Sequence, residues 1–111
     1  MHMSRAKGNI AEEKAVSILE SLGFTIKSRN FYSRFGELDI IVQKDGVTHF
    51  IEVKSSISYE PLENITPIKI RRLLKTIDYY ILKNSITSAW QLDAFVFRGQ
   101  EYEIIENITL F

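Results

Sequence analysis

The chain has 111 residues, 45% of them hydrophobic and 25% charged, values typical of one globular domain that can bury its own core. It contains no cysteine, which excludes a disulfide framework, thiol catalysis and a cysteine zinc site. Lysine plus arginine balance aspartate plus glutamate at 14 each, so the basic surplus of many nucleic-acid-binding proteins is missing.

The sequence shows no targeting or membrane segment. No apolar run approaches the roughly 18 residues of a membrane helix, and residues 1–5 lack an apolar signal core. We therefore predict a cytoplasmic protein that forms a single domain over residues 1–111 and has no membrane partner. Met1-His2, ahead of Met3, is interpreted as a cloning remnant.

The first half of the chain predicts one helix and three strands. Residues 10–22 form a helix whose apolar residues share one stripe, and Gly23 ends it (Ala11, Ala15, Ile18, Leu19, Leu22). Residues 24–31 form a strand, and residues 32–36 turn into a second strand around Asp39. Lys44-Asp45-Gly46 is a hairpin turn into a third strand over residues 47–54.

The second half predicts a loop, a helix and two strands. Residues 55–66 lose periodicity and form a loop beside the second and third strands. Thr66-Pro67 starts a helix that runs to about Lys83, with five inward residues (Ile70, Leu73, Leu74, Ile77, Ile81). Residues 90–97 and 101–106 form the last strands. The order α-β-β-β-α-β-β predicts an α/β fold with a mixed central sheet flanked by helices.

Acidic residues and a lysine occupy the second and third strands. Alternation places Glu37, Asp39 and Ile41 on one face and the intervening residues on the other (Leu38, Ile40, Val42). On the third strand Phe50, Glu52 and Lys54 share a face, so the hairpin brings Asp39, Glu52 and Lys54 together. Carboxylates on rigid strands suit Mg²⁺ or Mn²⁺, and a nearby lysine can stabilise charge on a phosphate. A second interpretation is a charged, solvated hairpin.

This pattern resembles the Asp…Glu-x-Lys signature of the restriction-endonuclease-like nucleases. Over nearly the whole chain up to about Phe97, the sequence resembles the YraN-like family, in the Holliday-junction-resolvase-like branch of that superfamily. The matching residues are Gly8, Glu12, Ala15, Gly23-Phe24, Arg29-Asn30, Gly36-Glu37-Leu38-Asp39, Glu52-Val53-Lys54, Lys69 and Asp93. Ser55-Ser56 and Gln91-Leu92 stand where the family usually has basic or Arg-aromatic residues.

The resemblance implies a restriction-endonuclease-like sheet and a Mg²⁺- or Mn²⁺-dependent nuclease, acting on DNA that is branched or structured, as a homodimer. Asp39, Glu52, Lys54 and Glu37 would be catalytic, and Asp39, Glu52 and Glu12 would hold the metal. Glu12 lies at the edge of the apolar stripe of its helix. It could instead be a first-turn glutamate favoured by the helix dipole.

Further residues have two interpretations each. Lys69, Arg34 and Arg72 are candidate nucleic-acid contacts or solvating charges. Asp93 is expected to have a structural partner, because an unpaired buried acid is costly. His49 is expected at the surface or at the edge of a turn.

Two other functions stay open from the sequence. A nucleic-acid-binding module could keep the nuclease fold without cleaving, and a protein-interaction subunit would expose an apolar patch near Tyr79-Tyr80 or Ile104-Ile105.

Overall fold

The computed structural model describes residues 3–56 and 60–110, so Met1 and His2 lie outside the described residues. Its elements are α1 (Met3–Ser21), β1 (Thr25–Ser33), β2 (Gly36–Lys44), β3 (Val47–Ser56), the 3-10 helix η1 (Pro61–Asn64), α2 (Pro67–Lys83), β4 (Ala89–Arg98), β5 (Glu101–Ile105) and the 3-10 helix η2 (Ile108–Leu110). The order of helices and strands is the predicted α-β-β-β-α-β-β.

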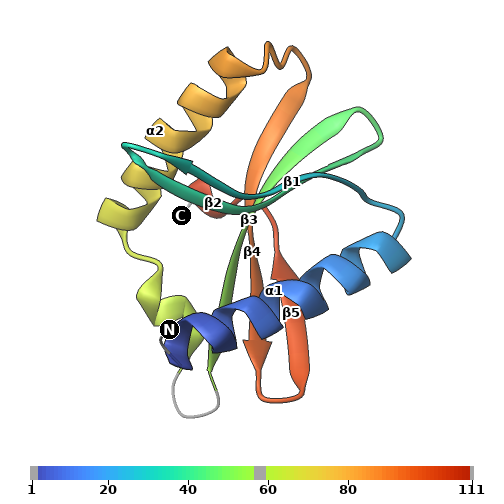
Figure 1. Ribbon diagram of the computed structural model, residues 1–111, viewed down its shortest axis with the longest axis vertical. Helices are drawn as coiled ribbons and strands as arrows, with labels where there is room; N and C mark the ends of the chain where they lie inside the picture. Colours follow the sequence, from blue (N-terminus) through green and yellow to red (C-terminus); the bar gives the residue numbers. More distant parts are fainter. Residues whose placement is uncertain (1–2, 57–59, 111) are drawn as a thin grey trace.

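The strands form one mixed sheet in the order β1-β2-β3-β4-β5. The β3–β4 pair is parallel and the other three pairs are antiparallel. A parallel pair needs a crossover, and α2 supplies it between β3 and β4 (Figure 1). Within the described ranges, no helix is long and apolar enough to cross a membrane.

Each face of the sheet carries one helix and one apolar core. On one face Ala15 and Leu19 of α1 pack with Phe95 of β4. On the other face Ile77 of α2 packs with Val96, the next residue of β4. Consecutive residues of β4 thus enter different cores, as the pleat of a strand requires, and the sheet is buried between α1 and α2 (Figure 1).

The ends of the helices follow local sequence signals. The hydroxyl of Thr66 accepts the Lys69 N–H at 3.3 Å, and Pro67 opens α2. Gly23 follows α1 with a φ of +93°, which lets the Phe24 N–H reach the carbonyl of Leu19 at 3.0 Å. Both predicted boundaries are confirmed.

The inward side of each helix differs from the prediction at a few positions. Leu22 is 42% exposed, because α1 ends at Ser21 and the chain turns away before Leu22 can reach the core. On α2, Thr76 and Tyr80 are buried although the five residues predicted to point inward include neither. The Thr76 hydroxyl donates to the Arg72 carbonyl at 2.9 Å, so its polar atom is satisfied inside the helix.

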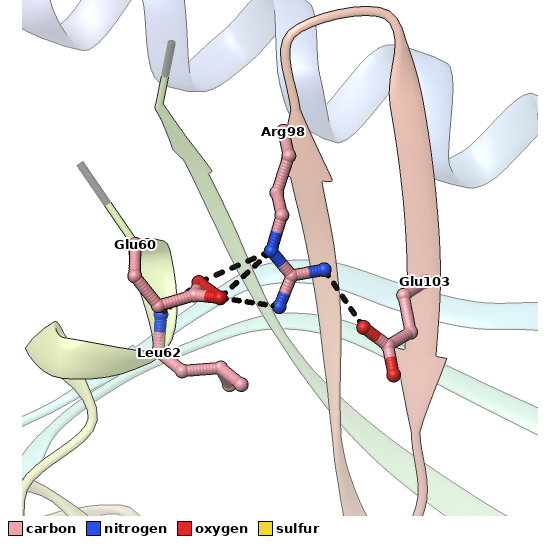
Figure 2. Close-up of polar contacts among 4 residues, drawn as sticks. All are labelled: Glu60, Leu62, Arg98 and Glu103. Carbon is pink, nitrogen blue, oxygen red and sulfur yellow. Dashed lines mark hydrogen bonds and ion pairs between the residues drawn. The ribbon is translucent and has the colours of Figure 1, made fainter. Parts of the chain in front are cut away.

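The predicted loop over residues 55–66 is shorter in the structure. β3 continues to Ser56, η1 covers Pro61–Asn64, and residues 57–59 lie outside the described residues. The Arg98 guanidinium contacts the Glu60 carboxylate at 2.7 and 2.8 Å and the Glu103 carboxylate at 2.7 Å (Figure 2). Glu60 also accepts the Leu62 N–H, so this ion-pair cluster fixes the start of η1 to the β4–β5 hairpin.

Candidate functional site

The site lies where β2 and β3 separate. Their ladder runs from the Lys44–Val47 pair to the Ile40–Ile51 pair and stops there. One residue further, the Asp39 carboxylate accepts the N–H of Val53 at 2.9 Å. A side chain therefore replaces a backbone hydrogen bond, and the Asp39 carboxylate is held between the diverging strands.

The pleat of β2 is irregular at the same place. Leu38 and Ile41 lie in the core beneath α2, whereas Ile40 and Val42 lie in the core beneath α1. The predicted division, with Leu38 opposite Ile41, is therefore wrong. The break coincides with the end of the ladder to β3, beyond which this stretch of β2 continues to pair with β1.

Glu52 and Lys54 share one face of β3, as predicted. Their β4 partners, Ala94 and Val96, pack in the core beneath α2 together with Phe50. The Lys54 ammonium lies 3.5 Å from the Glu52 carboxylate, and both side chains are largely buried. The strand thus presents a carboxylate and an ammonium next to each other at the edge of an apolar core.

Asp39 and Glu52 interact electrostatically. Burial, and then the negative charge of Asp39, raise the pKa of Glu52 to about 8, and the Lys54 ammonium offsets only part of this rise. The structure therefore brings Asp39, Glu52 and Lys54 together, as the hairpin prediction required.

α1 adds a third carboxylate to this cluster. Burial, and then the charges of Asp39 and Glu37, raise the pKa of Glu12 to about 7, and Arg29 lowers it partly. Among the described residues, no hydrogen-bond partner reaches the buried Oε1 atom of Glu12. Glu13, the next residue, is exposed and pairs with Arg29 at 2.9 Å, as expected for the solvated side of the helix.

Asp39, Glu52 and Glu12 are the candidate oxygen ligands for a divalent cation. Within the described part of the chain the buried Oε1 atom of Glu12 has no hydrogen-bond partner, and the pKa values of Glu12 and Glu52 are raised in part by neighbouring negative charge. An all-oxygen donor set of Asp39, Glu52 and Glu12 is what Mg²⁺ and Mn²⁺ prefer. A bound cation would remove the repulsion that raises both pKa values.

The three basic candidates lie on the surface of the molecule. Arg34 lies over the ring of Phe35, with its guanidinium carbon 4.8 Å from the ring centre. Lys69 and Arg72 are exposed in the first half of α2. Within the part of the chain that the structure describes, none of the three forms an ion pair, so all stay available to an anionic ligand.

A second polar cluster lies on β3 and β4. His49 is only 8% exposed, so its predicted surface position is wrong. Its Nδ1 atom lies 2.7 Å from Oδ2 of Asp93, whose Oδ1 accepts N–H groups from Gln91 and Asn107. The ligand atoms of His49, Asp93 and Glu106 lie within 4.8 Å of one another. Asp93 is hydrogen-bonded through both oxygens, so the structural partner expected for it is present.

The fold and the site define a small α/β protein with a carboxylate–lysine cluster at a strand fork, compatible with a restriction-endonuclease-like fold. The sequence matches the Uncharacterised protein family UPF0102 over residues 11–106, and the chain belongs to this family. It is 54% identical to a UPF0102 protein of Wolinella succinogenes over 97% of this chain and 100% of the relative. It is 53% identical to a UPF0102 protein of Helicobacter hepaticus over 96% of this chain and 97% of the relative.

Proposed function

We propose that this protein is a Mg²⁺- or Mn²⁺-dependent endonuclease that hydrolyses phosphodiester bonds in DNA. The observation that carries the proposal is the position of Asp39. Its carboxylate is fixed by the Val53 N–H at the strand fork and interacts electrostatically with Glu52 of β3 and Glu12 of α1. Acidic side chains from β3 and from α1 thus each interact with Asp39, an arrangement that apolar packing alone does not need.

Each group has a role in such a reaction. Asp39, Glu52 and Glu12 would hold the cation, which polarises the phosphate and lowers the pKa of a bound water. The Asp39 carboxylate keeps its orientation because the Val53 N–H fixes one oxygen. Lys54, beside Glu52, stabilises negative charge that develops on the phosphate oxygens. Glu37, whose charge acts on Glu12, would orient a water molecule at the edge of the site.

The test combines metal titration with cleavage. Mg²⁺ and Mn²⁺ are titrated by calorimetry into the wild type and into Asp39→Asn/Glu52→Gln, substitutions that keep side-chain shape. The same proteins are incubated with single-stranded, duplex and four-way-junction DNA. Glu101→Gln, at an exposed position of β5, is the control for loss of one surface charge. We expect metal binding and cleavage in the wild type and control and neither in the double variant.

The other outcomes separate the alternatives. Metal binding and DNA binding without cleavage of any substrate would make the protein a non-cleaving nucleic-acid-binding module. If the wild type binds no divalent cation, the carboxylate cluster is structural and the nuclease proposal is wrong. Comparing the cleavage rates of four-way-junction and duplex DNA decides whether branched DNA is preferred.

A further inference from the structure

Aromatic rings and cations alternate where the β1–β2 turn meets α2. Tyr79 of α2 packs against Phe31 and Phe35, with ring centres 6.1 Å apart in each case. The Lys83 ammonium lies 5.7 Å from the Phe31 ring centre and 5.9 Å from that of Tyr79. Arg34 covers the ring of Phe35 at 4.8 Å. We call these five residues the aromatic ridge.

The ridge lies at the surface. Tyr79 is 40% exposed, and Arg34 and Lys83 are exposed as well. In a buried core a cation beside aromatic rings would be desolvated, whereas here each cation contacts a ring and water together. The ridge therefore presents ring surface and positive charge on the outside of the molecule.

The charge of α2 supports an anionic ligand. The helix contains five cations and one acid, a surplus of 5 − 1 = +4 in a chain whose net charge is zero (Lys69, Arg71, Arg72, Lys75, Lys83 and Asp78). Lys75, Tyr79 and Lys83 are spaced four residues apart and so share one side of the helix. The helix that carries the ridge thus has a net positive charge.

The ridge adjoins the carboxylate cluster. Phe35 precedes Gly36, the first residue of β2, and Asp39 lies four residues after Phe35, about 13 Å along an extended strand. Gly36 approaches α2 so closely that a Cβ atom there would lie 3.3 Å from the Thr76 hydroxyl. A ligand on the ridge therefore lies beside the strand that carries Glu37 and Asp39.

We propose that the aromatic ridge binds a single-stranded segment of nucleic acid, whose bases stack on Phe35 and Tyr79 while Arg34 and Lys83 contact its phosphates. Bases must be unpaired to stack on protein rings, and successive rings beside cations are the features of single-strand binding surfaces. This inference rests on the proposed nuclease function and adds to it: the substrate would carry an unpaired segment next to the bond that is cleaved.

The test measures binding without cleavage. A fluorescein-labelled oligothymidylate is titrated in EDTA, with fluorescence anisotropy as the readout, against the wild type, Tyr79→Leu and Lys83→Gln. Stacking on one ring predicts about a tenfold loss of affinity for Tyr79→Leu. Loss of one phosphate contact predicts that Lys83→Gln reduces the slope of log affinity against log salt by about one. Tyr102→Leu, which changes an exposed tyrosine on β5, is the matched control and should bind like the wild type.

The outcomes distinguish this inference from the nuclease proposal. Because EDTA removes divalent metal and prevents cleavage, ridge-dependent binding of the oligonucleotide by the wild type would support this inference even if no DNA is ever cleaved. Wild-type affinity in a folded Tyr79→Leu variant, checked by circular dichroism, would overturn the inference. A change in sedimentation coefficient of Tyr79→Leu without a change in DNA affinity would also overturn it, because the ridge would then join two copies of the chain.

Discussion

Replacing Glu52 with glutamine should make the metal-free protein more stable at alkaline pH. In the folded protein, burial and the charge of Asp39 raise the pKa of Glu52 from 4.5 to about 8. At 1.36 kcal/mol for each pKa unit, ionising Glu52 in the folded rather than the unfolded chain costs at most about 5 kcal/mol. Glutamine has nearly the same shape and cannot ionise, so the substitution removes this cost.

The direction of the pH dependence follows from the raised pKa. Below pH 4.5 Glu52 is protonated in both states and folding is not penalised. As the pH rises from 4.5 to about 8, the unfolded chain ionises first, and the free energy of unfolding of the wild type falls. The raised pKa of Glu12 lowers the unfolding free energy of the wild type and of Glu52→Gln in the same way, so it cancels when the two unfolding free energies are subtracted.

The assay is urea denaturation in EDTA, followed by far-ultraviolet circular dichroism, across the pH range from 4.5 to about 8 that the Glu52 pKa defines. The difference in unfolding free energy, Glu52→Gln minus wild type, should grow with pH toward the upper bound of about 5 kcal/mol. Glu101→Gln, at an exposed position, should differ from the wild type in unfolding free energy by the same amount at every pH. A flat difference for Glu52→Gln would refute the burial and repulsion assigned to this carboxylate. Mg²⁺ at the alkaline end should stabilise the wild type more than the variant.

Three further substitutions test other parts of the structure. Gly36 has a φ of +144°, and in Gly36→Ala the new methyl carbon would lie 3.3 Å from the Thr76 hydroxyl oxygen of α2. Chemical denaturation should therefore show a decrease of about 1–3 kcal/mol in the unfolding free energy. Gly46→Ala, with a φ of +77° and open space, should lose less, and equal losses would show that the contact is irrelevant. Asp93→Ala should lower the unfolding free energy by about 3–5 kcal/mol without changing metal affinity, and calorimetry showing weaker metal binding would contradict its structural role. Glu12→Gln should weaken Mn²⁺ binding about tenfold, whereas Glu13→Gln should not, and equal affinities would remove Glu12 from the site.

The elements were predictable because their signals are local. Thr66 and Pro67 mark the start of α2, and Gly23 marks the end of α1, through hydrogen bonds within a few residues. The approach of Glu52 and Lys54 to Asp39 followed from strand alternation and a short hairpin turn, so most of the candidate site was predictable too.

The predictions that failed concern residues whose surroundings depend on contacts distant in sequence. His49 is buried because Asp93, 44 residues away, reaches it across the parallel β3–β4 pair, and no local pattern specifies that partner. Leu38 lies on the same side of the sheet as Ile41 because the β2–β3 ladder ends early, and the point where two strands separate is set by tertiary packing. The aromatic ridge was missed for the same reason, since its members come from β1, the following turn and α2.

The Asp39–Val53 hydrogen bond limits how this site can change. One carboxylate oxygen of Asp39 forms the hydrogen bond that links β2 to β3 at the fork, and the same carboxylate would hold the metal. A substitution at Asp39 therefore alters the scaffold together with the chemistry. Asparagine keeps an oxygen that can accept the Val53 N–H, whereas alanine leaves that N–H without its acceptor. Substitution of Asp39 would lower stability even in a descendant that no longer needed the reaction. Retention of an aspartate at this position is therefore explained by its role in the fold as well as by activity.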